Sequence, residues 1–113
     1  MRCTNLGMAK ELRLVYVTHE NHAKAKALAR KLLKERLVAC VNILPHTEAV
    51  YWWKDRIEAC PEAALLCKTT AKNVPKLIKR IKQLHPYDIP CVLSLKVEKG
   101  NPAYLNWLEK ECR

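Results

Sequence analysis

Several sequence features of common functional classes are missing from this 113-residue chain. It contains no Phe and only two Gly residues, Gly7 and Gly100. RNA-recognition modules stack bases on a Phe- and Gly-bearing motif, and phosphate-binding loops need Gly, so neither signature is present. No apolar run reaches the ~18 residues of a membrane span. Residues 1–7 lack the apolar core of a secretory signal. We therefore expect a cytoplasmic protein with no membrane contact.

The six cysteines include no Cys-x-x-Cys pair, so a disulfide framework or zinc knuckle is not indicated. Cys40, Cys67 and Cys91 fall inside predicted strands, where a free thiol commonly packs as a small hydrophobic group. No Ser-His-Asp set or Cys-His pair is indicated by local spacing. We expect no enzymatic activity.

The formal net charge of +10 permits a polyanionic partner but does not establish one, because solvated basic helix faces give the same value. The positive charge lies on the predicted helices, away from the sheet face on which RNA-recognition modules bind bases. Nucleic acid is therefore not an expected partner.

The segment from Leu37 to Thr70 organises the chain as a long β-hairpin. A first apolar run, 37–44, is followed by Pro45 and then by Tyr51-Trp52-Trp53. A charged break at residues 54–56 separates it from an alternating segment. The first arm would extend about 50 Å, whereas a compact chain of this length has a radius of gyration near 13 Å. The three aromatic residues at the tip are therefore a predicted contact between subunits. The alternative is a monomer in which Pro45 folds the arm back.

The remaining pattern predicts a strand from Leu12, a helix capped by Thr18 or Asn21, a second helix from about Asn73, and a strand over 91–97. A short helix follows Asn101. The element order is β-α-β-β-α-β plus a helix, an α+β ferredoxin-like sandwich. Residues 12–113 form one predicted domain after a disordered extension over 1–11, and patterned sequence begins late enough for Met8 to be the natural start.

Candidate ligand residues follow the second helix. His85 and Asp88, with Cys91 at the next strand, could hold a borderline or soft metal ion. The alternative for His85 is a cation at the helix C-terminus. Lys68 lies among apolar strand residues, which predicts either an anion-binding cleft between subunits or an exposed edge lysine.

Five segments together resemble the CutA family of divalent-cation tolerance proteins. They are Leu37–Pro45, Tyr51–Lys54, Lys68–Thr70, His85–Pro90 and Tyr104–Leu108. The resemblance implies a homotrimer similar to PII-type signalling proteins, in which the hairpins extend the sheet between subunits through Tyr51, Trp52 and Trp53.

The same resemblance implies a role in tolerance of copper or other divalent cations. Copper-binding members carry Cys at the position of Val17 and His at that of Leu84, so only His85 of that set is present. Cys91 stands where the family usually has Glu, and a soft sulfur there favours Cu(I) or Zn²⁺. The predicted metal residues are His85 and Cys91, and the predicted pocket residues are Trp53, Lys68, Tyr87 and Asp88. The alternative is a PII-like trimer that senses a small anion or metabolite without binding metal.

Overall fold

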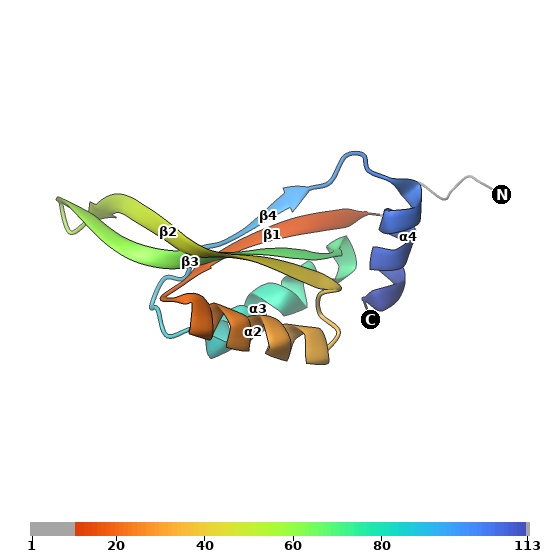
Figure 1. The fold of residues 1–113 in the computed structure, drawn as a ribbon, viewed down its shortest axis with the longest axis horizontal. Coiled ribbons are helices and arrows are strands. Elements are labelled where there is room, and N and C mark those ends of the chain that lie inside the picture. The colour runs from red at the N-terminus through yellow and green to blue at the C-terminus, as the bar shows by residue number, and fades with distance from the viewer. Residues whose placement is uncertain (1–10, 113) are drawn as a thin grey trace.

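A four-stranded antiparallel sheet carries the rest of the fold in the computed structural model, which describes residues 11–112 (Figure 1). The elements are β1 (Leu12–His19), α2 (His22–Lys34), β2 (Cys40–Trp53), β3 (Arg56–Thr70), the 3₁₀ turn η1 (Ala71–Asn73), α3 (Val74–Leu84), β4 (Val92–Lys96) and α4 (Pro102–Glu111). This order confirms the predicted α+β ferredoxin-like fold. Apart from Glu11, the predicted N-terminal extension lies outside the described residues.

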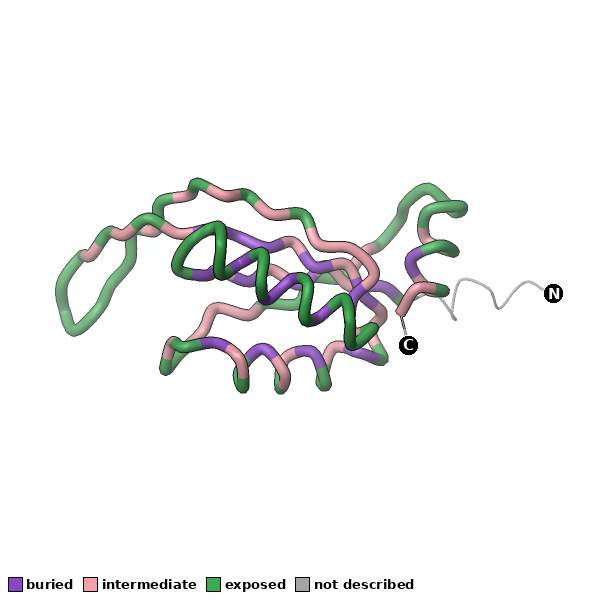
Figure 2. The backbone as a smooth tube through the Cα atoms, turned by 60° about the horizontal axis from the view of Figure 1, so that its bottom comes forward, coloured by how far each residue is buried: buried purple, intermediate pink, exposed green. Residues whose placement is uncertain are grey.

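The strands lie in the order β2-β3-β1-β4, so β3 and β1 are central. Helices α2 and α3 cover one face of the sheet, and the core lies between them and the strands (Figure 2). Val15 and Val17 of β1 point into this core and are fully buried. Leu28 and Leu32 of α2 and Leu77 and Ile81 of α3 meet them from the other side, as the apolar helical stripes predict.

Side-chain caps fix where two of the helices begin. Asn21 accepts a hydrogen bond from the Lys24 amide at 2.9 Å, which makes it, rather than Thr18, the cap of α2. Asn101 caps α4 in the same way through the Ala103 amide. Helix α3 ends at Leu84 because Pro86 disfavours helical backbone at His85, whose ψ is 135°.

The hairpin of β2 and β3 extends beyond the rest of the molecule, as the sequence predicted (Figure 1). The chain measures 55 × 27 × 23 Å and has a radius of gyration of 15.5 Å. Pro45 does not fold the first arm back. It lies instead at a register shift between Leu44 and Thr47, where two residues of β2 oppose one of β3. A bulge tolerates proline because it leaves ladder positions unpaired.

This bulge reverses which side chains of β2 face which side of the sheet. Before it, Val41 and Ile43 pack on the helix side. Beyond it, Thr47 pairs with Glu62 and Ala49 pairs with Cys60, and these even-numbered β3 residues share the face opposite the helices. Odd-numbered residues of distal β2 therefore point to that opposite face, which we call the open face.

The open face is apolar and exposed in the single chain. Leu93 and Leu95 of β4 are 58% and 49% exposed, and Leu44 of β2 is 45% exposed. Pairing across the sheet places Tyr16 beside Leu93 and Leu14 beside Leu95. Helix α4 lies at the end of the sheet opposite the hairpin tip and leaves much of this surface uncovered (Figure 1).

Candidate functional site

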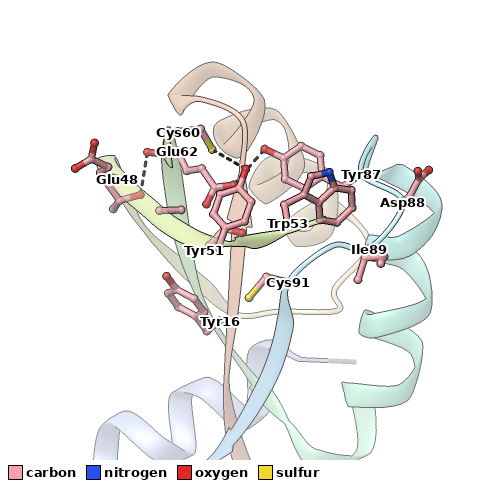
Figure 3. A pocket seen from close by; sticks show the side chains of 13 residues that line it. Tyr16, Glu48, Tyr51, Trp53, Cys60, Glu62, Tyr87, Asp88, Ile89 and Cys91 are labelled. Atoms are coloured by element: carbon pink, nitrogen blue, oxygen red, sulfur yellow. Dashed lines mark hydrogen bonds between the residues drawn. The ribbon is translucent and has the colours of Figure 1, made fainter. Parts of the chain in front are cut away.

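A pocket of about 640 Å³ lies on the open face, where β1 ends and the hairpin leaves the rest of the sheet (Figure 3). Three segments form it: the end of β1, the distal hairpin and the loop between α3 and β4. The lining residues are Tyr16, Thr18, Thr47, Glu48, Ala49, Tyr51, Trp53, Cys60, Glu62, Tyr87, Asp88, Ile89 and Cys91. The bulge in β2 is what turns Thr47, Ala49, Tyr51 and Trp53 toward this side of the sheet.

The loop that closes the pocket is fixed at His85. This residue is 6% exposed, and its Nε2 atom lies 2.7 Å from the Thr18 carbonyl oxygen. Because a carbonyl only accepts, Nε2 carries the proton and donates. Its Nδ1 accepts from the Tyr87 amide at 3.3 Å. His85 therefore joins the end of β1 to the loop, and both ring nitrogens are already engaged.

His19 stacks on His85, with ring centroids 4.2 Å apart and planes inclined by 22°. It is 4% exposed, and its Nδ1 accepts from the Glu20 amide at 2.8 Å. Burial lowers the pKa of His19, and the nearby His85 lowers it further. The stacked pair favours the neutral form of His19.

Two tyrosines hold polar partners on the pocket wall. The Tyr87 hydroxyl donates to Glu62 Oε2 at 3.2 Å, and burial followed by the Glu62 charge raises the pKa of Tyr87 to about 12. The Tyr51 hydroxyl lies 3.7 Å from Cys60 Sγ, and this contact raises the pKa of Tyr51. Both phenols are therefore neutral at physiological pH and can serve as hydrogen-bond donors.

The pocket lining is suited to binding a cation, although the chain as a whole is basic. Glu48, Glu62 and Asp88 supply three carboxyl groups, and no Lys or Arg lines the pocket. Cys60 and Cys91 add two thiols, and burial raises the pKa of Cys91. Aromatic faces and carboxylates attract cations, and thiols select soft ones.

The structure brings together four of the residues that the sequence indicated: Trp53, Tyr87, Asp88 and Cys91 all line this pocket. His85 lies just behind it, stacked on His19. Within residues 11–112, no group of three or more His, Cys, Asp or Glu side chains is placed to hold a metal ion.

Lys68 lies elsewhere on the open face. It pairs with Leu14 at the start of β1, whereas the pocket begins at Tyr16 and Thr18. Its Nζ donates to the Tyr104 hydroxyl at 3.1 Å and lies 5.3 Å from the centre of that ring. The hydrogen bond to Tyr104 raises the pKa of Lys68. In a single chain Lys68 therefore contacts α4 and not the pocket.

Sequence reasoning did not place Glu62, Cys60 or Tyr16 in the site. The alternating pattern of its strand predicts that Glu62 faces solvent. Only the positions of the bulge and of the loop after α3 show that it lines the pocket. A usable signal was present in the topology, because the chain leaving α3 must pass the end of β1 to form β4.

Comparison with known proteins places these features in a family. A profile of the CutA1 divalent ion tolerance proteins matches residues 13–111. The chain belongs to the CutA1 family. The divalent-cation tolerance protein CutA of Thermus thermophilus is 40% identical over 97 residues, covering 86% of this chain and 94% of that protein.

Solved CutA1 structures share the fold. Those from Thermus thermophilus and Oryza sativa superpose with TM-scores of 0.88 and 0.89, at 38% and 39% identity. They cover 90% and 91% of this chain, and the match spans 99% and 94% of theirs.

Some CutA relatives are longer than this chain. The mouse protein CutA is 40% identical over 95 residues, which cover 84% of this chain but only 54% of the mouse protein. The names of the relatives described here refer to CutA or to tolerance of divalent cations, and none refers to an enzymatic activity. Among the described residues, no helix is both long and apolar enough to span a bilayer.

Proposed function

We propose that this CutA1-family chain acts in divalent-cation tolerance by binding a soft cation, copper foremost, in the pocket between the distal hairpin and the loop after α3. The observation that carries the proposal is the lining itself, which combines three carboxyl groups and two thiols and has no basic side chain. The cation is the protein's cargo in this proposal, and the fold does not depend on it.

We further propose that the working form is a cytoplasmic homotrimer. The exposed leucines of the open face and the extended hairpin support this, because monomers seldom leave such apolar surfaces uncovered. A second copy on the open face would also lie over the pocket. Five possible metal donors line the pocket, but within residues 11–112 no three of them are placed to hold one metal ion. In the trimer, donors from two subunits would complete the site.

The second candidate, a trimer that senses a small anion, rests on Lys68. Its ammonium group is held near Tyr104 on the open face, where a neighbouring subunit could bring an anion to it. The absence of basic side chains from the pocket favours the cation, so we retain copper or another soft divalent metal as the main proposal.

Isothermal titration with Cu(II), and with Cu(I) under reductant, tests direct binding. We expect Cys91→Ser to weaken the affinity at least tenfold, because sulfur is the donor that selects soft metals. The matched control is Cys112→Ser, which removes a partly buried thiol that lies beside Thr69 and outside the pocket. It should leave the affinity unchanged.

The variant His85→Ala separates the two predicted metal residues. Both ring nitrogens of His85 are engaged within the chain, so we expect a smaller loss of affinity than for Cys91→Ser. Equal affinity in wild type, Cys91→Ser and His85→Ala would contradict direct binding at this site.

A further inference from the structure

The two long helices hold a large share of the positive charge of the chain. Helix α2 contains five basic residues and α3 contains four, and neither contains an acidic residue. Together they hold nine of the 21 Lys and Arg residues and none of the 11 Asp and Glu residues. The rest of the sequence is therefore close to neutral.

Most of this charge is unpaired and faces solvent. Among residues 11–112, acidic partners within 4 Å occur only for Lys24 and Arg80 of the two helices, which pair with Glu20 and Glu35. The remaining exposed cations, together with Lys72 in η1, form what we call the basic face. Its members are Lys26, Arg30, Lys31, Lys34, Lys72, Lys76, Lys79 and Lys82.

The helical period places the centre of the basic face directly away from the sheet. In α3, Leu77 and Ile81 point into the core, while Lys76 and Lys79 lie on the opposite side, and Lys72 precedes them in η1. In α2, Arg30 and Lys34 stand opposite the buried stripe. The Arg80–Glu35 ion pair, at 2.9 Å, ties α3 to the end of α2, and the two helices lie side by side on the same side of the sheet (Figure 2). The two rows of cations therefore belong to one side of the molecule.

The chemistry of this surface points to a phosphate backbone and not to bases. Neither helix contains Phe, Tyr or Trp, so this surface offers no large aromatic ring on which a base could stack. At 1.5 Å per residue, the row from Lys72 to Lys79 covers about 10 Å, which is about three phosphates of one strand at 3.4 Å. A duplex needs no more than such a cationic surface for binding that does not depend on sequence.

An anionic membrane fits this surface less well. Amphipathic helices bind bilayers by inserting their apolar face, but here Ala25, Leu28, Leu32, Leu77 and Ile81 are buried against the sheet. We propose that the basic face of α2 and α3 binds the backbone of a nucleic-acid duplex without reading its sequence. The expectation that nucleic acid is not a partner concerned aromatic residues on the sheet, and the basic face lies on the other side of the molecule.

Fluorescence anisotropy with a labelled random-sequence DNA duplex and the full chain tests this proposal. We expect micromolar affinity at about 50 mM salt. The logarithm of the binding constant should fall linearly with the logarithm of the salt concentration. The variant combining Lys34→Gln, Lys76→Gln and Lys79→Gln should bind at least tenfold more weakly, and the slope should shrink by about 0.9 for each lost phosphate contact.

The control combines Lys96→Gln, Lys99→Gln and Lys110→Gln, which removes the same charge from exposed positions outside the two helices. It should bind within twofold of wild type. Equal losses in both variants would show that only net charge matters and would overturn the proposal. So would an absence of duplex binding at about 50 mM salt, or binding to vesicles containing phosphatidylglycerol without binding to the duplex. Circular dichroism of both variants checks that they fold.

Discussion

At the scale of single residues, the stacked side chains of His19 and His85 hold the loop between α3 and β4 against the end of β1. His85 bonds to the Thr18 carbonyl across 67 residues of sequence, and His19 covers its ring. The groups around His19 are Glu20, Lys24, His85 and Tyr87. Desolvation disfavours a charge on His19 more than the Glu20 carboxylate favours it.

This arrangement makes stability depend on pH. Because folding lowers the pKa of His19, the unfolded chain binds more protons than the folded chain below about pH 6.5. The stability that neutral His19 contributes is therefore present above pH 6.5 and is lost as the pH falls from there through the folded pKa. We expect the urea midpoint to fall between pH 7 and pH 5, and His19→Gln to reduce that dependence.

The matched control is His46→Gln, at an exposed position on β2. It should leave the pH dependence of the wild type intact. A His19→Gln profile that is parallel to the wild-type profile would show that this histidine does not titrate differently in the folded protein.

Residue-scale prediction from the sequence was partial for a physical reason. Asp88 and Cys91 could be singled out because they bring a carboxylate and a thiol close to His85 in the sequence, and Trp53 and Tyr87 because they lie in segments that resemble the CutA family. The Tyr87–Glu62 hydrogen bond and the His19–His85 stack could not, because they join residues far apart in sequence.

At the scale of elements, the hairpin turn stores backbone strain. Lys54 and Asp55 have φ values of 51° and 63°, and they join Trp53 to its partner Arg56. A two-residue turn with positive φ at both positions matches the twist of the strands, but it favours Asn-Gly and similar pairs. Neither residue of this turn is Gly.

Relieving that strain should stabilise the protein. We expect Asp55→Gly to raise the free energy of unfolding by about 0.5–1 kcal/mol, after allowing for the greater freedom of Gly in the unfolded chain. The control is Arg56→Gly, in the strand itself, which should lower stability by about 0.5–1 kcal/mol. Urea unfolding at one fixed protein concentration measures both. A lower stability for Asp55→Gly would contradict the assignment of strain to the turn.

The order and type of the elements followed from the sequence because each long element has a clear apolar period. The helical stripes of α2 and α3 and the alternation of β1 identify their buried sides directly. The apolar period did not predict the bulge at Pro45. One extra residue there reverses the side of the sheet to which each later side chain of β2 points. The pocket depends on that reversal, which is why Trp53 alone among the hairpin residues that line it was predicted as a pocket residue.

At the scale of the whole molecule, the two faces of the sheet have opposite characters. The helix side is sealed by its own core and carries a cationic outer surface. The open side leaves Leu44, Leu93 and Leu95 in solvent. On the opposite face of the distal hairpin, beyond the helices, Val50 and Trp52 are 64% and 72% exposed. Such exposure predicts burial against further copies of the chain, and that burial would complete both the sheet and the pocket.

The most direct test of this account is the mass of the wild-type chain in dilute buffer, measured by size-exclusion chromatography with multi-angle light scattering. We expect a single species of three times the 13.1 kDa chain mass. A mass of 13.1 kDa at micromolar concentration, with a tryptophan emission that shows buried indoles, would contradict it.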